Sequence, residues 1–81
     1  MYYVYILRSL KNPRKTYKGY TSTTPPNRLE YHNAGFSIYT NQDKPWKIIW
    51  YCAFEDIKKA KEFEIYLKSG SGRAFTNKHL I

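Results

Sequence analysis

One carboxylate stands among apolar side chains in the last third of the sequence. Apolar residues recur there at helical spacing, and Glu64 falls on the same side of the predicted helix as the stripe formed by Ile57, Ala60, Phe63 and Leu67. Glu62 falls on the opposite, solvent-facing side. A carboxylate on an apolar face needs a cation, a hydrogen-bond donor or a metal ion as its partner. Glu64 is therefore either a metal ligand or one half of an ion pair with a nearby Lys or Arg.

Arg28 and His32 form a second group with chemical potential. They lie four residues apart in a predicted helix and therefore share one of its faces. A guanidinium can hold a phosphate with two parallel hydrogen bonds and stabilise charge that develops on it. A neutral imidazole can accept or relay a proton near neutral pH. The same pair is also typical of a solvated helix surface, so both interpretations stay open.

The elements that must position these residues are predicted as follows. Three apolar and aromatic runs indicate strands at residues 2–7, 16–21 and 46–54. The short connection through Asn12 and Pro13 suggests an antiparallel hairpin between the first two. Thr24 precedes two prolines and predicts the start of a helix that runs through His32 and stops at Gly35.

A second helix is predicted to begin after Asp56, to continue to about Lys68 and to end at Gly70. We expect a turn at residues 69–72 and a short last helix at residues 73–80. The order β-β-α-β-α-α predicts an α+β fold with a small three-stranded antiparallel sheet flanked by helices. Nothing divides the sequence, so residues 1–81 are expected to form one domain.

The charge balance points to a polyanionic partner. Fourteen Lys and Arg against six Asp and Glu give a net charge of +8, and residues 1–28 contain no acid at all. Such a basic stretch favours contacts with phosphates, although solubility alone also requires some net charge. Cys52 is the single cysteine, which excludes an intramolecular disulfide, and its apolar surroundings predict a core position. Without a signal peptide or a long apolar run, the sequence predicts a cytoplasmic protein.

Two short tyrosine motifs stand in the first two predicted strands. The first strand holds Tyr3-Val4-Tyr5 and the second holds Tyr17-Lys18-Gly19, with eleven residues between Tyr5 and Tyr17. These motifs resemble the two halves of the signature of the GIY-YIG nuclease family. Tyr5 stands for the tyrosine of the first half, and Tyr17 and Gly19 stand for the outer residues of the second.

The resemblance continues along nearly the whole chain. Arg28 follows Tyr17 by eleven residues, His32 follows one turn later, and Glu64 lies in a helix that ends with Tyr66-Leu67-Lys68. Residues 66–80 are similar to the same region of small stand-alone members of the family. The chain also resembles the N-terminal catalytic domain of the excision-repair endonucleases within this family, which implies a link to DNA repair.

The resemblance implies a metal-dependent endonuclease that hydrolyses phosphodiester bonds in nucleic acid, with DNA as the expected substrate. Glu64 would hold one Mg²⁺ or Mn²⁺, a sparse site that suits Mg²⁺ because this ion keeps much of its hydration. Arg28 would clamp the phosphate that is cut. Tyr17, Tyr5 and His32 are the candidates for activating water, and the sequence leaves open which of them acts as the base, since a tyrosine is a poor base at neutral pH unless cations lower its pKa.

The sequence departs from the family signature at three positions. Tyr3 replaces the usual Gly of the first half, Lys18 replaces the apolar middle residue of the second, and Tyr20 follows Gly19 where some relatives carry Lys. Lys18 is interpreted either as a nucleic-acid contact or as ordinary charge on a strand edge. Asn77 is a candidate for the family's late Asn, although its spacing is loose.

Two other functions compete with the nuclease interpretation. The first is a binding module of the same fold that cuts weakly or not at all. In either case substrate choice must come from this surface or from a protein partner, and a homodimer also stays open. The second is a structural zinc domain that uses Cys52, His32 and His79, whose spacings match no compact ligand pattern.

Three aromatic side chains are further expected either to stack on bases or to pack against the sheet, namely Tyr31, Phe36 and Tyr39.

Overall fold

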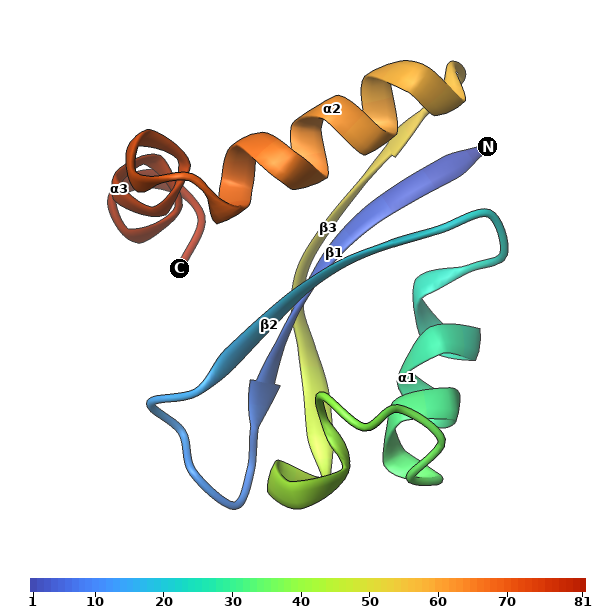
Figure 1. Ribbon diagram of the computed structural model, residues 1–81, viewed down its shortest axis with the longest axis vertical. Helices are drawn as coiled ribbons and strands as arrows, with labels where there is room; N and C mark the ends of the chain where they lie inside the picture. Colours follow the sequence, from blue (N-terminus) through green and yellow to red (C-terminus); the bar gives the residue numbers. More distant parts are fainter.

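The computed structural model describes residues 1–81 and confirms the predicted α+β fold (Figure 1). Three strands and three α-helices follow one another in the order β-β-α-β-α-α, with one short 3-10 helix before the last strand. Their bounds are β1 Tyr2–Ser9, β2 Thr16–Thr21, α1 Pro25–Asn33, η1 Asn41–Asp43, β3 Trp46–Phe54, α2 Ile57–Lys68 and α3 Gly70–His79.

The sheet is antiparallel with β1 in its centre and β2 and β3 at its edges. Tyr5 of β1 lies opposite Gly19 of β2 and opposite Tyr51 of β3. A register shift between Ile6 and Leu7 interrupts the pairing of β1 with β3. The two signature motifs therefore lie side by side, and the second of them occupies an open edge of the sheet.

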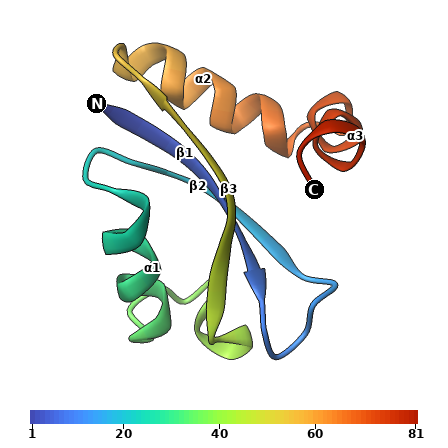
Figure 2. The ribbon, with the colours of Figure 1, turned by 180° about the vertical axis from the view of Figure 1, so that it is seen from behind.

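The helices cover both faces of the sheet. Figures 1 and 2 show α1 on one side of the strands and α2 with α3 on the other. Val4 and Ile6 pack against Ala60 and Leu67 of α2, because alternate side chains of a strand point to opposite faces. Tyr5 and Leu7 point the other way and form a second cluster, together with Trp46 and the half-buried Leu29 of α1.

The predicted signals at the ends of α1 are confirmed. The hydroxyl of Thr24 accepts a hydrogen bond from the backbone N–H of Asn27, and Pro25 occupies the first helical position. After the helix, Gly35 adopts a φ of 86°, a left-handed conformation that residues with a Cβ rarely adopt. These signals fix the direction in which α1 presents Arg28 and His32.

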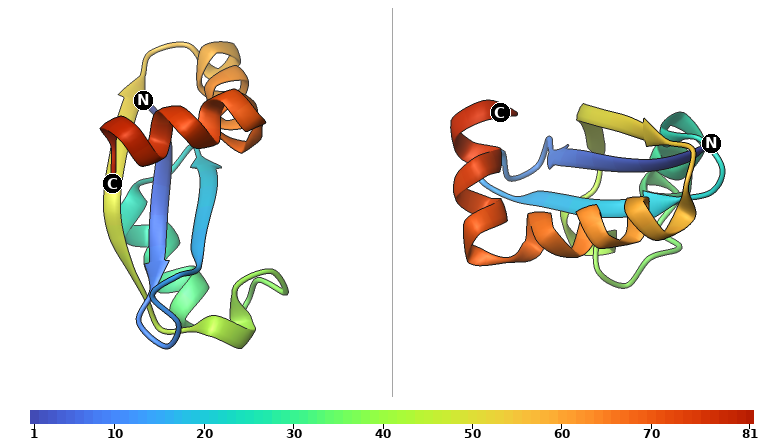
Figure 3. Two further views of the ribbon diagram at one scale, coloured as in Figure 1. Left: turned by 90° about the vertical axis from the view of Figure 1, so that its left-hand side faces the viewer. Right: turned by 90° about the horizontal axis from the view of Figure 1, so that it is seen from above.

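The prediction of a turn at residues 69–72 is wrong, because these residues form the first turn of α3 (Figure 3). Ser69 ends α2 and caps α3 at the same time: its hydroxyl donates to the Tyr66 carbonyl and accepts from the Gly72 N–H. Helix α2 therefore ends at Lys68, and Gly70 begins the next helix. A Cβ on Gly72 would collide with the backbone of Tyr66, so the two helices meet closely at this corner.

Cys52 lies half-buried on β3, against the cluster between the sheet and α2. Burial raises the pKa of its thiol above the usual value, as expected for a cysteine that packs rather than reacts. None of the helices combines the length and the apolar character needed to cross a bilayer.

Candidate active site

A buried chain of hydrogen bonds links β1, α1 and the loop that follows α1. The hydroxyl of Tyr5 lies 2.9 Å from Nε2 of His32, and Nδ1 of His32 lies 2.7 Å from the hydroxyl of Thr40. All three side chains are almost completely inaccessible to solvent. A neutral imidazole has one N–H and one acceptor nitrogen, so His32 can either accept from Tyr5 or donate to it, with Thr40 taking the complementary role.

Burial keeps both ring systems neutral near pH 7. Desolvation lowers the pKa of His32 to about 4, and the positive charge of Arg28 acts in the same direction. Burial raises the pKa of Tyr5 above its usual value, and the nearby Arg28 guanidinium only partly opposes that rise. Because His32 has no exposed surface and both of its nitrogens are engaged, it holds Tyr5 in place rather than facing a solvent water.

Gly19 makes room for the Tyr5 ring on the face of the sheet that α1 covers. A Cβ at this position would lie 2.5 Å from both Cζ and the hydroxyl oxygen of Tyr5, and 3.0 Å from a ring carbon of Tyr17. Such distances are far below van der Waals contact. The glycine of the second motif is thus required by the tyrosine of the first, directly across the strand pair.

Arg28 lies beside this group on α1. Its guanidinium carbon lies 4.0 Å from the centre of the Tyr31 ring, a stacked arrangement that keeps the side chain from collapsing onto the surface. Its Nε is buried and has no hydrogen-bond partner. Arg28 as a whole is half-buried, and the two terminal nitrogens of a guanidinium carry further N–H groups that can bind an anion.

Tyr17 is the most accessible aromatic residue of the group. It is half-buried, and its ring centre lies 4.9 Å from that of His32 and 6.4 Å from that of Tyr5. Its position on the edge strand β2 also places the residue in the lining of a surface pocket.

Glu64 reaches the same edge of the sheet from α2, where its carboxylate forms an ion pair with Lys68 one turn later, at 3.1 Å. The exposed fraction of the Glu64 side chain is 20%, so it lies at the border of the apolar stripe and pairs with a neighbouring lysine. Ile57, predicted to share that stripe, is exposed at the start of the helix. The negative charge of Glu64 is the smallest of the causes that act on the raised pKa of Tyr5.

The acidic, histidine and cysteine side chains of the chain could hold a metal ion only at a site with few protein ligands. No three His, Cys, Asp or Glu side chains gather closely enough to hold an ion by themselves, and this includes Cys52, His32 and His79. A single accessible carboxylate suits a largely hydrated Mg²⁺ or Mn²⁺ whose remaining ligands are waters and substrate oxygens. It does not suit a closed zinc site.

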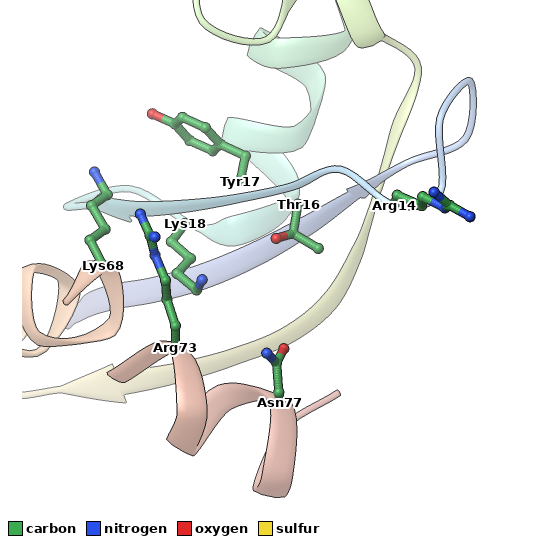
Figure 4. A pocket seen from close by; sticks show the side chains of 7 residues that line it. All are labelled: Arg14, Thr16, Tyr17, Lys18, Lys68, Arg73 and Asn77. Carbon is green, nitrogen blue, oxygen red and sulfur yellow. The ribbon is translucent and has the colours of Figure 1, made fainter. Parts of the chain in front are cut away.

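A pocket of about 480 Å³ opens between β2 and α3, beside the Glu64–Lys68 pair (Figure 4). We call it the cationic pocket, and it is lined by Arg14, Thr16, Tyr17, Lys18, Lys68, Arg73 and Asn77. Figure 4 shows the side chains of Lys18, Lys68 and Arg73 gathered at one end of the pocket, whereas the Tyr17 ring points to the other side of β2. The sequence left the roles of Lys18 and Asn77 open, and both residues border this pocket.

Sequence reasoning missed three residues around the site. Thr40 carried no signal, because it lies in a loop and reaches His32 only after folding. Arg14 and Arg73 were visible only as members of basic stretches, and only the packing of α3 near β2 makes them neighbours.

Two aromatic side chains of the loop after α1 are exposed. The exposed fractions of Phe36 and Tyr39 are 71% and 77%, so these side chains do not pack against the sheet. Tyr31 is half-buried and lies between the Arg28 guanidinium and the Phe36 ring, whose centre is 5.6 Å away. Of the two expectations for these aromatics, packing against the sheet is therefore wrong for Phe36 and Tyr39.

Comparison with known proteins agrees with this geometry. A search among curated proteins finds no match. The family model described as the GIY-YIG catalytic domain matches residues 1–78, which is nearly the whole chain. The chain therefore belongs to the GIY-YIG family, whose fold is of nuclease type and implies a nucleic-acid substrate.

Proposed function

We propose that this protein is a divalent-metal-dependent endonuclease that hydrolyses phosphodiester bonds in DNA. The observation that carries the proposal is the grouping of Tyr5 with Tyr17 and Arg28 on the side of the sheet that α1 covers, together with Glu64 on α2, which packs against the edge strand β2 from the other side. The charges of Tyr17, Arg28 and Glu64 all contribute to the shifted pKa of Tyr5, so these groups share one electrostatic environment. A basic surface and a family of catalytic domains support the same conclusion.

In this proposal Glu64 would hold one Mg²⁺ or Mn²⁺. The ion, when bound, would polarise the phosphate and stabilise negative charge on the leaving oxygen. Glu64 is chosen because it lies at the border of the apolar stripe of α2, the helix that packs against β2, whereas Glu62 of the same helix is exposed.

Arg28 would bind the scissile phosphate. Its guanidinium is held over Tyr31, and its terminal nitrogens can donate two parallel hydrogen bonds to a phosphate. As charge accumulates on the phosphate during attack by water, this contact would strengthen and lower the barrier.

Tyr17 would contact the attacking water, because it is the accessible member of the tyrosine–histidine group. Tyr5 and His32 would act as positioning residues, since both are buried and bonded to each other. The oxygen of the water would form the new bond to phosphorus and its proton would pass to bulk solvent, while the bond to the leaving oxygen breaks and that oxygen takes up a proton from solvent.

The ion pair between Lys68 and Glu64 favours a second candidate function. A lysine ammonium 3.1 Å from the carboxylate already neutralises it, and a metal ion must compete with that charge. A chain that keeps this pair in the presence of metal would be a nucleic-acid-binding module with little or no cleavage.

Cleavage assays on purified protein separate the two functions. Labelled single-stranded, duplex and branched DNA, with RNA of the same sequence, would be incubated with Mg²⁺, Mn²⁺ or EDTA. We expect metal-dependent cuts by the wild type and by Glu62→Gln, which changes an exposed carboxylate of the same helix, and none by Glu64→Gln. Circular dichroism checks that both variants fold. Binding without cutting on every substrate would leave the binding module as the function.

A further inference from the structure

We propose that the cationic pocket binds the sugar-phosphate backbone of the substrate strand on one side of the bond that is cut. The inference rests on the proposed function in one respect: the phosphate held by Arg28 defines the position of the cut. It adds a second phosphate site, formed mainly by Lys18, Lys68 and Arg73, with Arg14 at its far end (Figure 4).

The composition of the pocket is that of an anion site. Four of its seven lining residues are cationic and none is acidic. Of the remaining three, Thr16 and Asn77 carry a hydroxyl and an amide group that can donate to phosphate oxygens, whereas the Tyr17 ring points to the other side of β2 (Figure 4). An aliphatic or aromatic ligand finds little apolar surface here.

The cations of the pocket lack counter-ions within the protein. The two ion pairs of the chain join Lys15 to Asp43 and Lys68 to Glu64, so Arg14, Lys18 and Arg73 have no acidic partner. Partial burial lowers the pKa of Lys18, and the charges of Arg73 and Lys68 lower it further. Cations that repel one another at a partly desolvated position are stabilised when a phosphate arrives between them.

The position of the pocket favours a backbone over a separate small anion. Tyr17 borders both the pocket and the tyrosine–histidine group, and Lys68 joins the pocket to Glu64. From there the cations continue along β2 to Arg14 in the turn that precedes it. A strand whose phosphate lies at Arg28 would therefore pass over the edge at Gly19 and place a neighbouring phosphate among Lys18 and Arg73.

Binding of labelled oligonucleotides, measured by fluorescence anisotropy in EDTA at several salt concentrations, tests this site without requiring cleavage. We compare the wild type with Arg73→Gln and Lys18→Gln. Lys78→Gln serves as the matched control, because it removes a charge from α3 at an exposed position outside the pocket. Each pocket variant is expected to bind about threefold to tenfold more weakly and to reduce the slope of log affinity against log salt by roughly 0.7–0.9, one phosphate contact. The control is expected to keep the wild-type slope.

A length series of oligonucleotides, with and without a 5′-phosphate, distinguishes a backbone from a chain end. Affinity that grows with oligonucleotide length in the wild type and is lost in both pocket variants supports the inference. This holds even if neither the wild type nor any variant cuts, in which case only the proposed catalysis fails. Affinity that follows the terminal phosphate alone overturns the backbone assignment. The site itself is overturned if both pocket variants keep the affinity and the salt slope of the wild type. It is also overturned if the wild type binds no oligonucleotide. Metal-dependent cleavage by the wild type would in that event leave the proposed function standing.

Discussion

Gly19 and Tyr5 face each other across the β1–β2 pair so closely that a Cβ on the glycine would lie 2.5 Å from the tyrosine hydroxyl oxygen. Tyr5 cannot move aside easily, because it is 1% exposed and bonded to His32. The glycine and the tyrosine of the two motifs are therefore one packing unit. This relationship explains in steric terms why the two motifs require each other.

Gly19→Ala is expected to lower stability by about 1–3 kcal/mol through overpacking and to abolish cleavage by displacing Tyr5. Thermal unfolding and the cleavage assay measure the two effects. Gly70→Ala is the control, because nothing lies within 4 Å of a Cβ at that position. Unchanged activity in Gly19→Ala would show that the position of the Tyr5 ring does not matter to the site.

The buried His32 predicts a pH dependence of folding. Its pKa falls from 6.5 to about 4 in the folded protein, so the unfolded chain binds more protons between these values. The stability that the neutral imidazole contributes is complete above about pH 6.5 and is lost as pH falls toward 4, in total about 3 kcal/mol.

Urea unfolding at about pH 7.5 and about pH 4.5 measures this loss. The wild type should lose more stability between the two pH values than His32→Gln, in which the titrating group is absent. Both proteins contain the same carboxylates, so the effect of their titration on stability cancels in the comparison. His79→Gln, at an exposed position, should retain the wild-type dependence. Equal losses in wild type and His32→Gln would contradict the lowered pKa.

Lys68→Gln should separate metal binding from nucleic-acid binding. Removing the ammonium from its place 3.1 Å from Glu64 should raise Mn²⁺ affinity in the absence of nucleic acid by on the order of threefold to tenfold. Oligonucleotide affinity should fall, since Lys68 also lines the cationic pocket. The pair is exposed, so the free energy of unfolding should change by less than about 0.5 kcal/mol.

Calorimetric Mn²⁺ titration checks the first effect and anisotropy the second. Lys59→Gln is the matched control, an exposed lysine earlier in α2 and outside the pocket. If Lys68→Gln bound Mn²⁺ no better than the wild type, Lys68 would not compete with the metal.

Ser69→Ala should loosen the corner between α2 and α3. The hydroxyl caps α3 at the Gly72 N–H and also bonds to the Tyr66 carbonyl, so its loss should cost about 1 kcal/mol. Because α3 supplies one wall of the cationic pocket, oligonucleotide affinity should fall as well. Ser71→Ala, which removes an exposed hydroxyl without such bonds, should leave thermal unfolding and binding almost unchanged. The same melting temperature for both variants would argue against the cap.

Most of the fold could be predicted because its signals are local. Thr24 before two prolines, Gly35 after α1 and Asp56 before α2 each act within one helical turn, and the structure confirms all three. The same logic failed at Ser69, where glycines suggested a turn but the serine hydroxyl starts a helix. Helix caps and turns use the same residue types, and only the residues that follow decide whether a helix begins.

The site was predictable only in part. Tyr5 and Tyr17 were selected through the resemblance to the GIY-YIG signature, whereas Arg28, His32 and Glu64 also stood out by their places on predicted helix faces; the catalytic roles of all five stay predictions. The partners Thr40 and Lys68 were out of reach for different reasons. Thr40 meets His32 through a loop contact that leaves no periodic pattern, whereas Lys68 was one of several lysines that could have paired with Glu64.

The sheet divides the proposed machinery between two layers with separate apolar cores. Arg28 arrives with α1 on one face, and Glu64 arrives with α2 on the other. A molecule in which only one helix layer has docked therefore holds the phosphate clamp or the metal ligand, but never both. Under the proposed mechanism, partly folded chains would be inert, and cleavage would require the cooperative docking of both helix layers.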